Sequence, residues 1–524
     1  MPLQSPPPVA ACVVRRVRRE ALAAVVVLAT TAGPVLAQLD LGGAPLAGGD
    51  EHWYRRTRGL LETSAPDPWA HRLTPRLPEH GWRVRWLRPE VRLLFNSLRP
   101  SDGDDGVVWA GRGLTGAAQG GVEARWGIVH LQVAPIVFRS QNRAFPLVDN
   151  GQTGPLRYGD AQFPGSIDLP QRFGDDPYGR ADAGDSFLAL EWRGATLGLS
   201  SARQLWGPAR EFPLVLGTHA GGFPHAFLGT TRPLSVGIGT VEARLIAARL
   251  EQSAWSPVQQ GENRRFHSGL TVTFRPRGVP WLAVGGNRTE TSPWPAGGPT
   301  LAQALGPFNG IMNAGNTSSL QTSGSNGFAS AFTRVAVPGS GLEIYGELSW
   351  EDFANDIRRF LQKPDDLNTV TIGLGRAWGD SPDALHWLGV ELTNGEVAHQ
   401  ERGQRGFVTP FPPYTHSPTV QGLTSRGQLL GSLATFRGSA AIATYERYTP
   451  RGRARFQVRR ELLLNALPTQ TTPQVALTGS AAVTRFIGQR EWSVELSPTY
   501  LSGAAEDPTG GAFGLSVSLR WRGF

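Results

Sequence analysis

The sequence predicts an all-β protein, a transmembrane antiparallel β-barrel with up-and-down topology and a small, partly helical N-terminal segment. The first observation is strict alternation of residue type. From Phe513 to Trp521 every second residue is apolar, and the residues between are Gly, Ser or Arg, as expected for a strand with one apolar face. The same pattern recurs at Val122–Trp126, Val129–Val137, Phe187–Trp192, Leu197–Leu199, Val241–Leu250, Phe266–Phe274, Phe328–Val337, Leu342–Trp350, Val370–Trp378, Leu388–Leu392 and Glu491–Leu496.

The second observation is that the linkers between these strands alternate in length. Linkers such as 192–195 and 436–440 are tight, whereas 140–184 and 395–424 are long and polar. Short turns at one edge and long loops at the other are typical of a transmembrane barrel, whose closed ring leaves no unpaired backbone in the hydrocarbon. A soluble exported β-sandwich would also alternate, but the number of strands and the regular rhythm of the linkers favour the barrel.

The N-terminus predicts export from the cytoplasm. A basic segment, an apolar stretch from Ala21 to Gly33 and the small residues before Gln38 have the order of a cleaved secretory signal peptide, here 1–37. We expect a periplasmic segment at 38–89, in which Trp53, Tyr54, Leu60 and Leu61 share a helical face, and the barrel at 90–524. The predicted location is the outer membrane of a Gram-negative type envelope.

Composition narrows the classes of function. The formal charge is +8 and falls to about +5 without the predicted signal peptide, which is too little for a nucleic-acid binder. The only cysteine, Cys12, lies in that peptide, so we expect no disulfide, no cysteine-based metal site and no cofactor. The content of 65 Gly and 41 Pro suits a chain with many turns.

An arginine ladder is the sharpest candidate for a binding site. Arg451, Arg453, Arg455 and Arg459 alternate with apolar residues that include Phe456, so a lipid-facing phenylalanine directs the arginines towards the lumen or its extension above the membrane. Guanidinium groups bind the carboxylates or phosphates of an acidic polysaccharide through charge-assisted hydrogen bonds. The alternative, favoured for most of these arginines, is internal pairing with inward-facing carboxylates, namely Glu343, Glu347, Glu491 and Glu495.

Three other residues are candidates for carbohydrate binding. Trp206, before a Gly-Pro pair, offers a flat ring for stacking on a sugar, or else holds a turn or belongs to the interfacial aromatic girdle. Tyr414 and His416 follow Pro412 and Pro413, and a stiffened loop with hydroxyl and imidazole groups suits sugar hydrogen bonding; His416 is equally suited to fixing the loop. The sequence lacks a Gly-x-Ser-x-Gly motif, and its adjacent Asp pairs in loops do not establish a glycosidase pair, so we expect no enzyme.

Four segments occur in an order that resembles a known family. They are "LWGPAREFPLVLGTHAGGFPHAFLGTTRPL" (205–234), "EIYGELSWEDF" (343–353), "FLQKPDDLNTVTIGLGRAW" (360–378) and "PPYTHSPTVQGLTSRGQLLGSLA" (412–434). Together they resemble the capsule assembly protein family typified by Wzi. The resemblance implies a monomeric barrel of 18 strands, a lumen occluded by loops, a helical periplasmic element and a lectin-like role in organising exported capsular polysaccharide. After Trp-Gly-Pro, family members often carry Gly and an aromatic residue, where this chain has Ala209-Arg210-Glu211.

Three functions therefore remain open. The first is a surface protein that binds polysaccharide, with outer-membrane lipid and the β-barrel insertion machinery as further partners. The second is a porin or sugar channel, and the third is an outer-membrane enzyme that modifies lipid or glycan. The long Gly- and Pro-rich loops at 140–184 and 287–326 favour a plugged lumen over an open channel.

Overall fold

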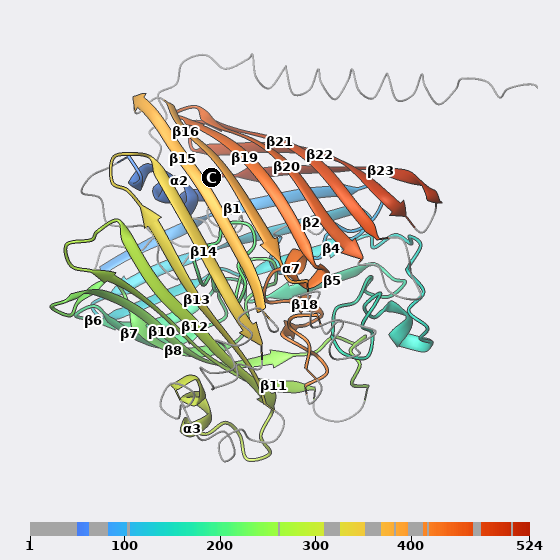
Figure 1. The fold of residues 1–524 in the computed structure, drawn as a ribbon, viewed down its shortest axis with the longest axis horizontal. Coiled ribbons are helices and arrows are strands. Elements are labelled where there is room, and N and C mark those ends of the chain that lie inside the picture. Colours follow the sequence, from blue (N-terminus) through green and yellow to red (C-terminus); the bar gives the residue numbers. More distant parts are fainter. Residues whose placement is uncertain are drawn as a thin grey trace, which may run out of the picture.

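The chain folds into a closed antiparallel β-barrel of 18 strands, as predicted (Figure 1). The computed structural model describes residues 50–61, 82–101, 105–259, 263–308, 325–351, 368–381, 384–396, 412–416, 419–464, 473–504 and 507–523. The signal peptide and the expectations at 38–49 and 62–81 lie outside these residues. No helix of the described residues is long and apolar enough to cross a membrane.

Neighbours in sequence are neighbours in the wall, so the topology is up-and-down. Three strands of the barrel consist of two segments each, namely β3 with β4, β5 with β6, and β8 with β9. The wall segments are β1 (Trp82–Asn96), β2 (Gly113–Trp126), β3 (Val129–Val133), β4 (Ile136–Ser140), β5 (Tyr178–Asp182), β6 (Phe187–Trp192), β7 (Ala195–Ser200), β8 (His225–Thr230), β9 (Leu234–Ser235), β10 (Gly239–Glu251), β11 (Arg264–Pro276), β12 (Leu282–Pro293), β13 (Asn326–Ala336), β14 (Leu342–Glu351), β15 (Asn368–Ser381), β16 (Ala384–Asn394), β19 (Ser439–Thr449), β20 (Gly452–Leu464), β21 (Gln474–Ile487), β22 (Arg490–Ala504) and β23 (Asp507–Arg522). β1 begins at Trp82, earlier than the expected boundary at residue 90.

The C-terminal strand closes the barrel. β23 pairs with β22 on one side and with β1 on the other, where Trp521 lies opposite Val91. Arg522 reinforces the closure through an ion pair to Glu90 at 2.8 Å and a second one to Glu491 at 3.4 Å. The first and last strands thus protect each other's edges, which would otherwise expose unpaired backbone groups.

The two faces of the wall differ as the alternation predicted. In β14, Leu342 and Ile344 are exposed on the outside, whereas Glu343 and Glu347 are buried on the inside. A period of two residues in a strand produces this separation. The exterior is therefore apolar and the interior polar, which is the arrangement of a transmembrane barrel.

One edge of the barrel carries tight turns. Arg193 and Gly194, which join β6 to β7, have φ values of +48° and +92°, as in the two-residue type I′ turns that match the twist of a hairpin. Helix α2 (Asp50–Gly59) lies at this edge, where the backbone N–H of Gly341 in the β13–β14 turn donates to Leu60. Figure 1 shows α2 in dark blue beside β15 and β16.

An arginine fixes α2 to the inside of the wall. The fully buried Arg56 donates to Glu343 at 3.0 and 3.1 Å and to the carbonyl of Pro208 at 2.7 Å. Arg334 of β13 binds the same carboxylate at 2.9 Å. The helix that the sequence suggested is thus present, and buried ion pairs connect it to the barrel; its periplasmic location stays a prediction.

Loops from the opposite edge fold inwards and form a plug, which we define as residues 141–177, 201–224 and the described part of 412–438. The plug includes the 3-10 helix η2 (Gly154–Tyr158), the short hairpin of β17 (Thr424–Ser425) and β18 (Gln428–Leu429), and helix α7 (Leu433–Arg437). Its segments are joined by backbone hydrogen bonds, such as Gly217 to Leu430 at 2.8 Å. A further short helix, α3 (Leu301–Ala304), follows β12.

The plug packs against one side of the wall. Its buried apolar residues, among them Ile167, Leu216 and Leu429, form one cluster with Phe227 of β8 and Ile246 of β10. Burying each aliphatic side chain of this size contributes about 1.5–3 kcal/mol to folding. The side of the lumen bounded by β6 to β13 is therefore filled.

Candidate functional site

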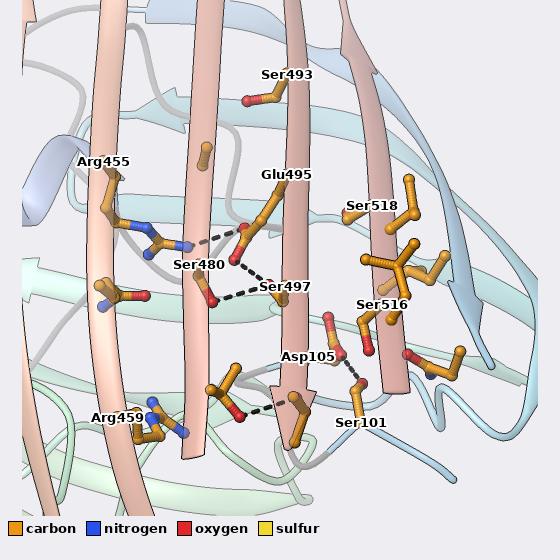
Figure 2. Close-up of a pocket in the computed structure, with 18 of the residues that line it drawn as sticks. Ser101, Asp105, Arg455, Arg459, Ser480, Ser493, Glu495, Ser497, Ser516 and Ser518 are labelled. Carbon is orange, nitrogen blue, oxygen red and sulfur yellow. Dashed lines mark hydrogen bonds and ion pairs between the residues drawn. The ribbon is translucent and has the colours of Figure 1, made fainter. Parts of the chain in front are cut away.

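The lumen is hollow beside β20 to β23 and β1. A cavity of about 320 Å³ lies there, between the wall, the plug and α2. The inward side chains of β21, β22 and β23 are mostly Ser, Thr, Gly and Ala, and such small side chains leave space that the plug does not fill. Figure 2 shows Ser480, Ser493, Ser497, Ser516 and Ser518 around this space.

Hydroxyl groups form one wall of the cavity. Thr478 and Thr499 are hydrogen-bonded across β21 and β22 at 2.9 Å, Ser480 and Ser497 at 2.8 Å, and Thr484 bonds to Ser493. Each hydroxyl has one hydrogen to donate and two lone pairs, so a paired hydroxyl keeps capacity for a ligand. The alternation in the sequence of β22 predicts that its polar side chains face inwards, but these hydroxyls were not among the predicted site residues.

Three of the predicted arginines face this cavity from β20. Arg453, Arg455 and Arg459 all line it, whereas Phe456 and Val458 point outwards with 49% and 58% of their side chains exposed. The predicted orientation of the ladder is correct for these three residues. Arg451 is different, because it lies in the β19–β20 turn, exposed and outside the cavity.

The cavity arginines are paired internally, as the sequence analysis favoured. Arg453 binds Glu446 at 2.8 Å and Arg455 binds Glu495 at 3.0 Å. Arg459 binds Glu211 at 3.4 Å and Glu461 at 3.2 Å.

Of the four carboxylates that we expected as partners, only Glu495 pairs with the ladder. Glu343 binds Arg56 and Arg334, and Glu491 binds Arg520 and Arg522. Glu347 accepts hydrogen bonds from Asn287 at 3.0 Å and from Ser330 at 2.6 Å. Alternation gives the direction of a side chain, but the partner depends on the register of neighbouring strands and on the plug.

Arg210 of the plug forms the junction between the cavity and α2. Its guanidinium lies 3.9 Å from the ring centre of Trp387 and 4.9 Å from that of Trp53, and it binds Glu446. Burial alone would lower the pKa of Arg210, but the neighbouring Glu446, Tyr448 and Glu211 together outweigh burial and raise it. The sequence marked Arg210 only as a departure from the Wzi-like pattern.

Glu391 of β16 holds the same loop in place. Its carboxylate accepts hydrogen bonds from the backbone N–H groups of Arg210, Glu211 and Phe212 at 2.8, 3.0 and 2.6 Å. The hydroxyl of Tyr345 donates to it as well, at 2.5 Å. Three backbone donors converging on one carboxylate define the position of Arg210 and Glu211 at the edge of the cavity.

Two aromatic candidates are buried in the plug and do not present a surface to a sugar. Trp206 is fully buried, packed against Gly269, where an added Cβ would lie 2.6 Å from the indole ring. Tyr414 is fully buried, stacks on Phe328 with ring centres 5.3 Å apart and donates to the carbonyl of Leu214 at 2.8 Å. The stacking role expected of Trp206 does not fit this burial, and neither does a place in a lipid-facing aromatic girdle, because the ring packs in the apolar cluster of the plug.

His416 retains partial exposure. Its Nδ1 lies 3.5 Å from the hydroxyl of Thr419, within the same loop. His416 does not line the cavity, so the structure does not bring it together with the cavity arginines. The seven predicted site residues are thus spread over the turn edge, the cavity and the plug.

One of three comparisons with known proteins supports the fold. No family model and no curated protein sequence matches the chain. Among solved structures, the chain is similar to Wzi, an outer membrane protein involved in group 1 capsule assembly in Escherichia coli and described as a carbohydrate-binding β-barrel. The identity is 13%, the match covers 82% of this chain and 83% of that one, and the TM-score is 0.55.

Porin structures are similar to a lower degree. A BenF-like porin from Pseudomonas fluorescens Pf-5 is 8% identical, over 84% of this chain and 98% of that chain, with a TM-score of 0.40. OccAB4 from Acinetobacter baumannii is 10% identical, over 83% and 97%, with a TM-score of 0.36. The likeness to Wzi shows that the chain has the fold of an outer-membrane β-barrel.

Proposed function

We propose that this protein is a monomeric outer-membrane barrel that binds exported surface polysaccharide and attaches or organises it at the cell surface. The observation that carries the proposal is the hollow half of the lumen, a polar cavity lined by hydroxyl and guanidinium groups beside a plug that fills the other half. These groups hydrogen-bond to sugar hydroxyls and to acidic substituents.

The location follows from the two faces of the barrel. Apolar side chains cover the outside, such as Leu374 and Val458, which are 53% and 58% exposed. A closed barrel satisfies its backbone hydrogen bonds within the wall, so it is stable in a bilayer. The similar fold of Wzi, which is described as carbohydrate-binding, supports the same role for this chain.

Co-sedimentation of the detergent-purified protein with high-molecular-weight surface polysaccharide from its own source tests the proposal. The expected result is saturable binding that an unrelated neutral glycan does not reproduce. A decrease in binding at high salt would indicate that charged contacts contribute, since salt screens them. Absence of binding to every native surface glycan would overturn the proposal.

A porin is the second candidate, since the cavity is open space within the lumen. Its distinguishing property is ion conductance across a planar bilayer. The packed contacts between plug and wall favour low conductance, and a steady open pore in the unmodified protein would favour the porin instead.

A further inference from the structure

We infer that the cavity beside β20 to β23 is itself the binding site and that it takes an acidic oligosaccharide segment, with uronate carboxylates on Arg455 and Arg459 and ring hydroxyls on the serines and threonines of β21 to β23. The inference rests on the proposed function and specifies its site and ligand class. It places the ligand inside the barrel wall rather than on the loops.

Exposure separates the arginines of the ladder into two kinds. Arg453 and Glu446 are 10% and 1% exposed, whereas Arg455 and Glu495 are 29% and 30% exposed. Removing one partner of a buried pair leaves an uncompensated charge and is costly, but a partly exposed pair contributes less to stability. A ligand carboxylate therefore replaces Glu495 at Arg455 at low cost, while Arg453 stays with Glu446 and serves the structure.

The cavity lining is rich in guanidinium groups. Carboxylates behind the lining also pair with them, since Arg520 binds Glu491 at 3.0 Å, and Glu446 is shared between Arg210 and Arg453. The lining arginines are Arg92, Arg99, Arg210, Arg453, Arg455, Arg459 and Arg520, and the lining carboxylates are Asp105, Glu211, Glu446, Glu461 and Glu495. Guanidinium groups bind carboxylates in a fixed two-pronged geometry.

Spacing and size favour an oligosaccharide over a single sugar. Arg455 and Arg459 lie four residues apart on the same face of β20, which corresponds to about 13 Å along the strand. The cavity of about 320 Å³ falls at the lower end of the range for ligand sites. It has room for a few sugar units and not for a folded chain.

The hydroxyl wall lies beside this arginine column. Figure 2 shows Arg455 and Glu495 joined below Ser493, Ser480 and Ser497 joined below that pair, and Ser516 and Ser518 on the next strand. The short serine and threonine side chains keep the wall flat, and their hydroxyl groups are available to hydrogen-bond to a ligand. Larger groups at these positions would occupy the volume that the sugar needs.

A reversible block of the cavity tests the inference in the folded protein. In a Cys12→Ser background, Ser516→Cys introduces a single thiol in the cavity, and Ser340→Cys places one on an exposed turn as the matched control. Each variant is labelled with a bulky methanethiosulfonate reagent, and binding of oligogalacturonate and of a maltooligosaccharide of equal length is measured. Labelling at 516 should weaken oligogalacturonate binding at least about tenfold, reduction should restore it, and labelling at 340 should change nothing.

Two charge variants give effects of opposite sign. Arg455→Gln should weaken oligogalacturonate binding about tenfold. Glu495→Gln should strengthen it, because Arg455 loses its internal competitor. If Arg455 and Glu495 were only a structural pair, both substitutions would leave affinity unchanged or lower it together.

The outcomes separate the site from the function. If native polysaccharide binds and the label at 516 leaves that binding unchanged, the luminal site is wrong while the proposed function stands. If the maltooligosaccharide binds as well as oligogalacturonate, the acidic ligand class is wrong. If neither native polysaccharide nor either oligosaccharide binds, the proposed function fails and this inference fails with it.

Discussion

The two halves of the lumen are built from the same alternation and have opposite properties. Beside β6 to β13, large apolar residues of the plug pack against Phe227 and Ile246 of the wall. Beside β20 to β23, the inward side chains are mostly small hydroxyl-bearing residues, together with arginines and their carboxylate partners, and about 320 Å³ stays open. The size of the inward residues, rather than the direction in which they point, decides which half is filled and which half is available to a ligand.

The largest expected effect is on the filled half. Trp206→Ala removes a fully buried ring and should lower the free energy of unfolding by about 3–5 kcal/mol, because a cavity remains where the indole was. Ser516→Ala in the hollow half should change it by less than about 0.5 kcal/mol. Denaturant unfolding in detergent, followed by tryptophan fluorescence, measures both; equal effects would remove the distinction between the halves.

The next effect concerns the buried ion pairs that hold α2. Glu343→Gln leaves Arg56 and Arg334 without their carboxylate and should destabilise the protein by about 3 kcal/mol. Hydrogen exchange should show faster exchange at 50–61 than in the unmodified protein. Unchanged exchange there would mean that packing alone positions the helix.

Loosening the plug should make the filled half of the lumen more open, as the hollow half already is. Glu391→Ala removes the acceptor for three backbone N–H groups at 210–212 and should cost about 1–3 kcal/mol locally. We expect more frequent channel openings in a planar bilayer, with Ser340→Ala as the control. Conductance equal to that of the unmodified protein would show that the loop stays in place without this carboxylate.

The smallest expected effect on stability is at the partly exposed Arg455–Glu495 pair of the cavity. Arg455→Gln should change the free energy of unfolding by no more than about 1 kcal/mol, although its effect on acidic oligosaccharide binding should be clear. The comparison with Glu343→Gln in the same denaturant series checks this. A loss as large as that for Glu343→Gln would assign Arg455 to the framework.

The sequence predicted local directions well and long-range partners poorly. Alternation placed Phe456 outside and Arg455 inside because a strand fixes side-chain direction every second residue. It also marked Glu495 as inward-facing, and Glu495 is the partner of Arg455. The prediction that Arg451 faces the lumen was wrong, because β20 begins at Gly452 and Arg451 lies in the turn before it. Strand ends are harder to locate from sequence than strand interiors.

The plug accounts for most of the other differences. Trp206 and Tyr414 are residue types that often bind sugars at exposed positions, but their loops fold inwards. Burial of each ring depends on residues distant in sequence, Gly269 for Trp206 and Leu214 for Tyr414. For the same reason the role of Arg210 between Trp53 and Trp387 had no local signal.

The sequence by itself therefore determined the class of fold, the apolar exterior and the inward direction of Arg453, Arg455 and Arg459, because period-two alternation is a local property of the chain. Only the tertiary structure decided which side of the lumen is filled, which carboxylates pair with the ladder and that hydroxyls line the space left over. These features depend on how loops from distant strands pack inside a closed wall, because the space available to each side chain depends on the volumes of all its neighbours.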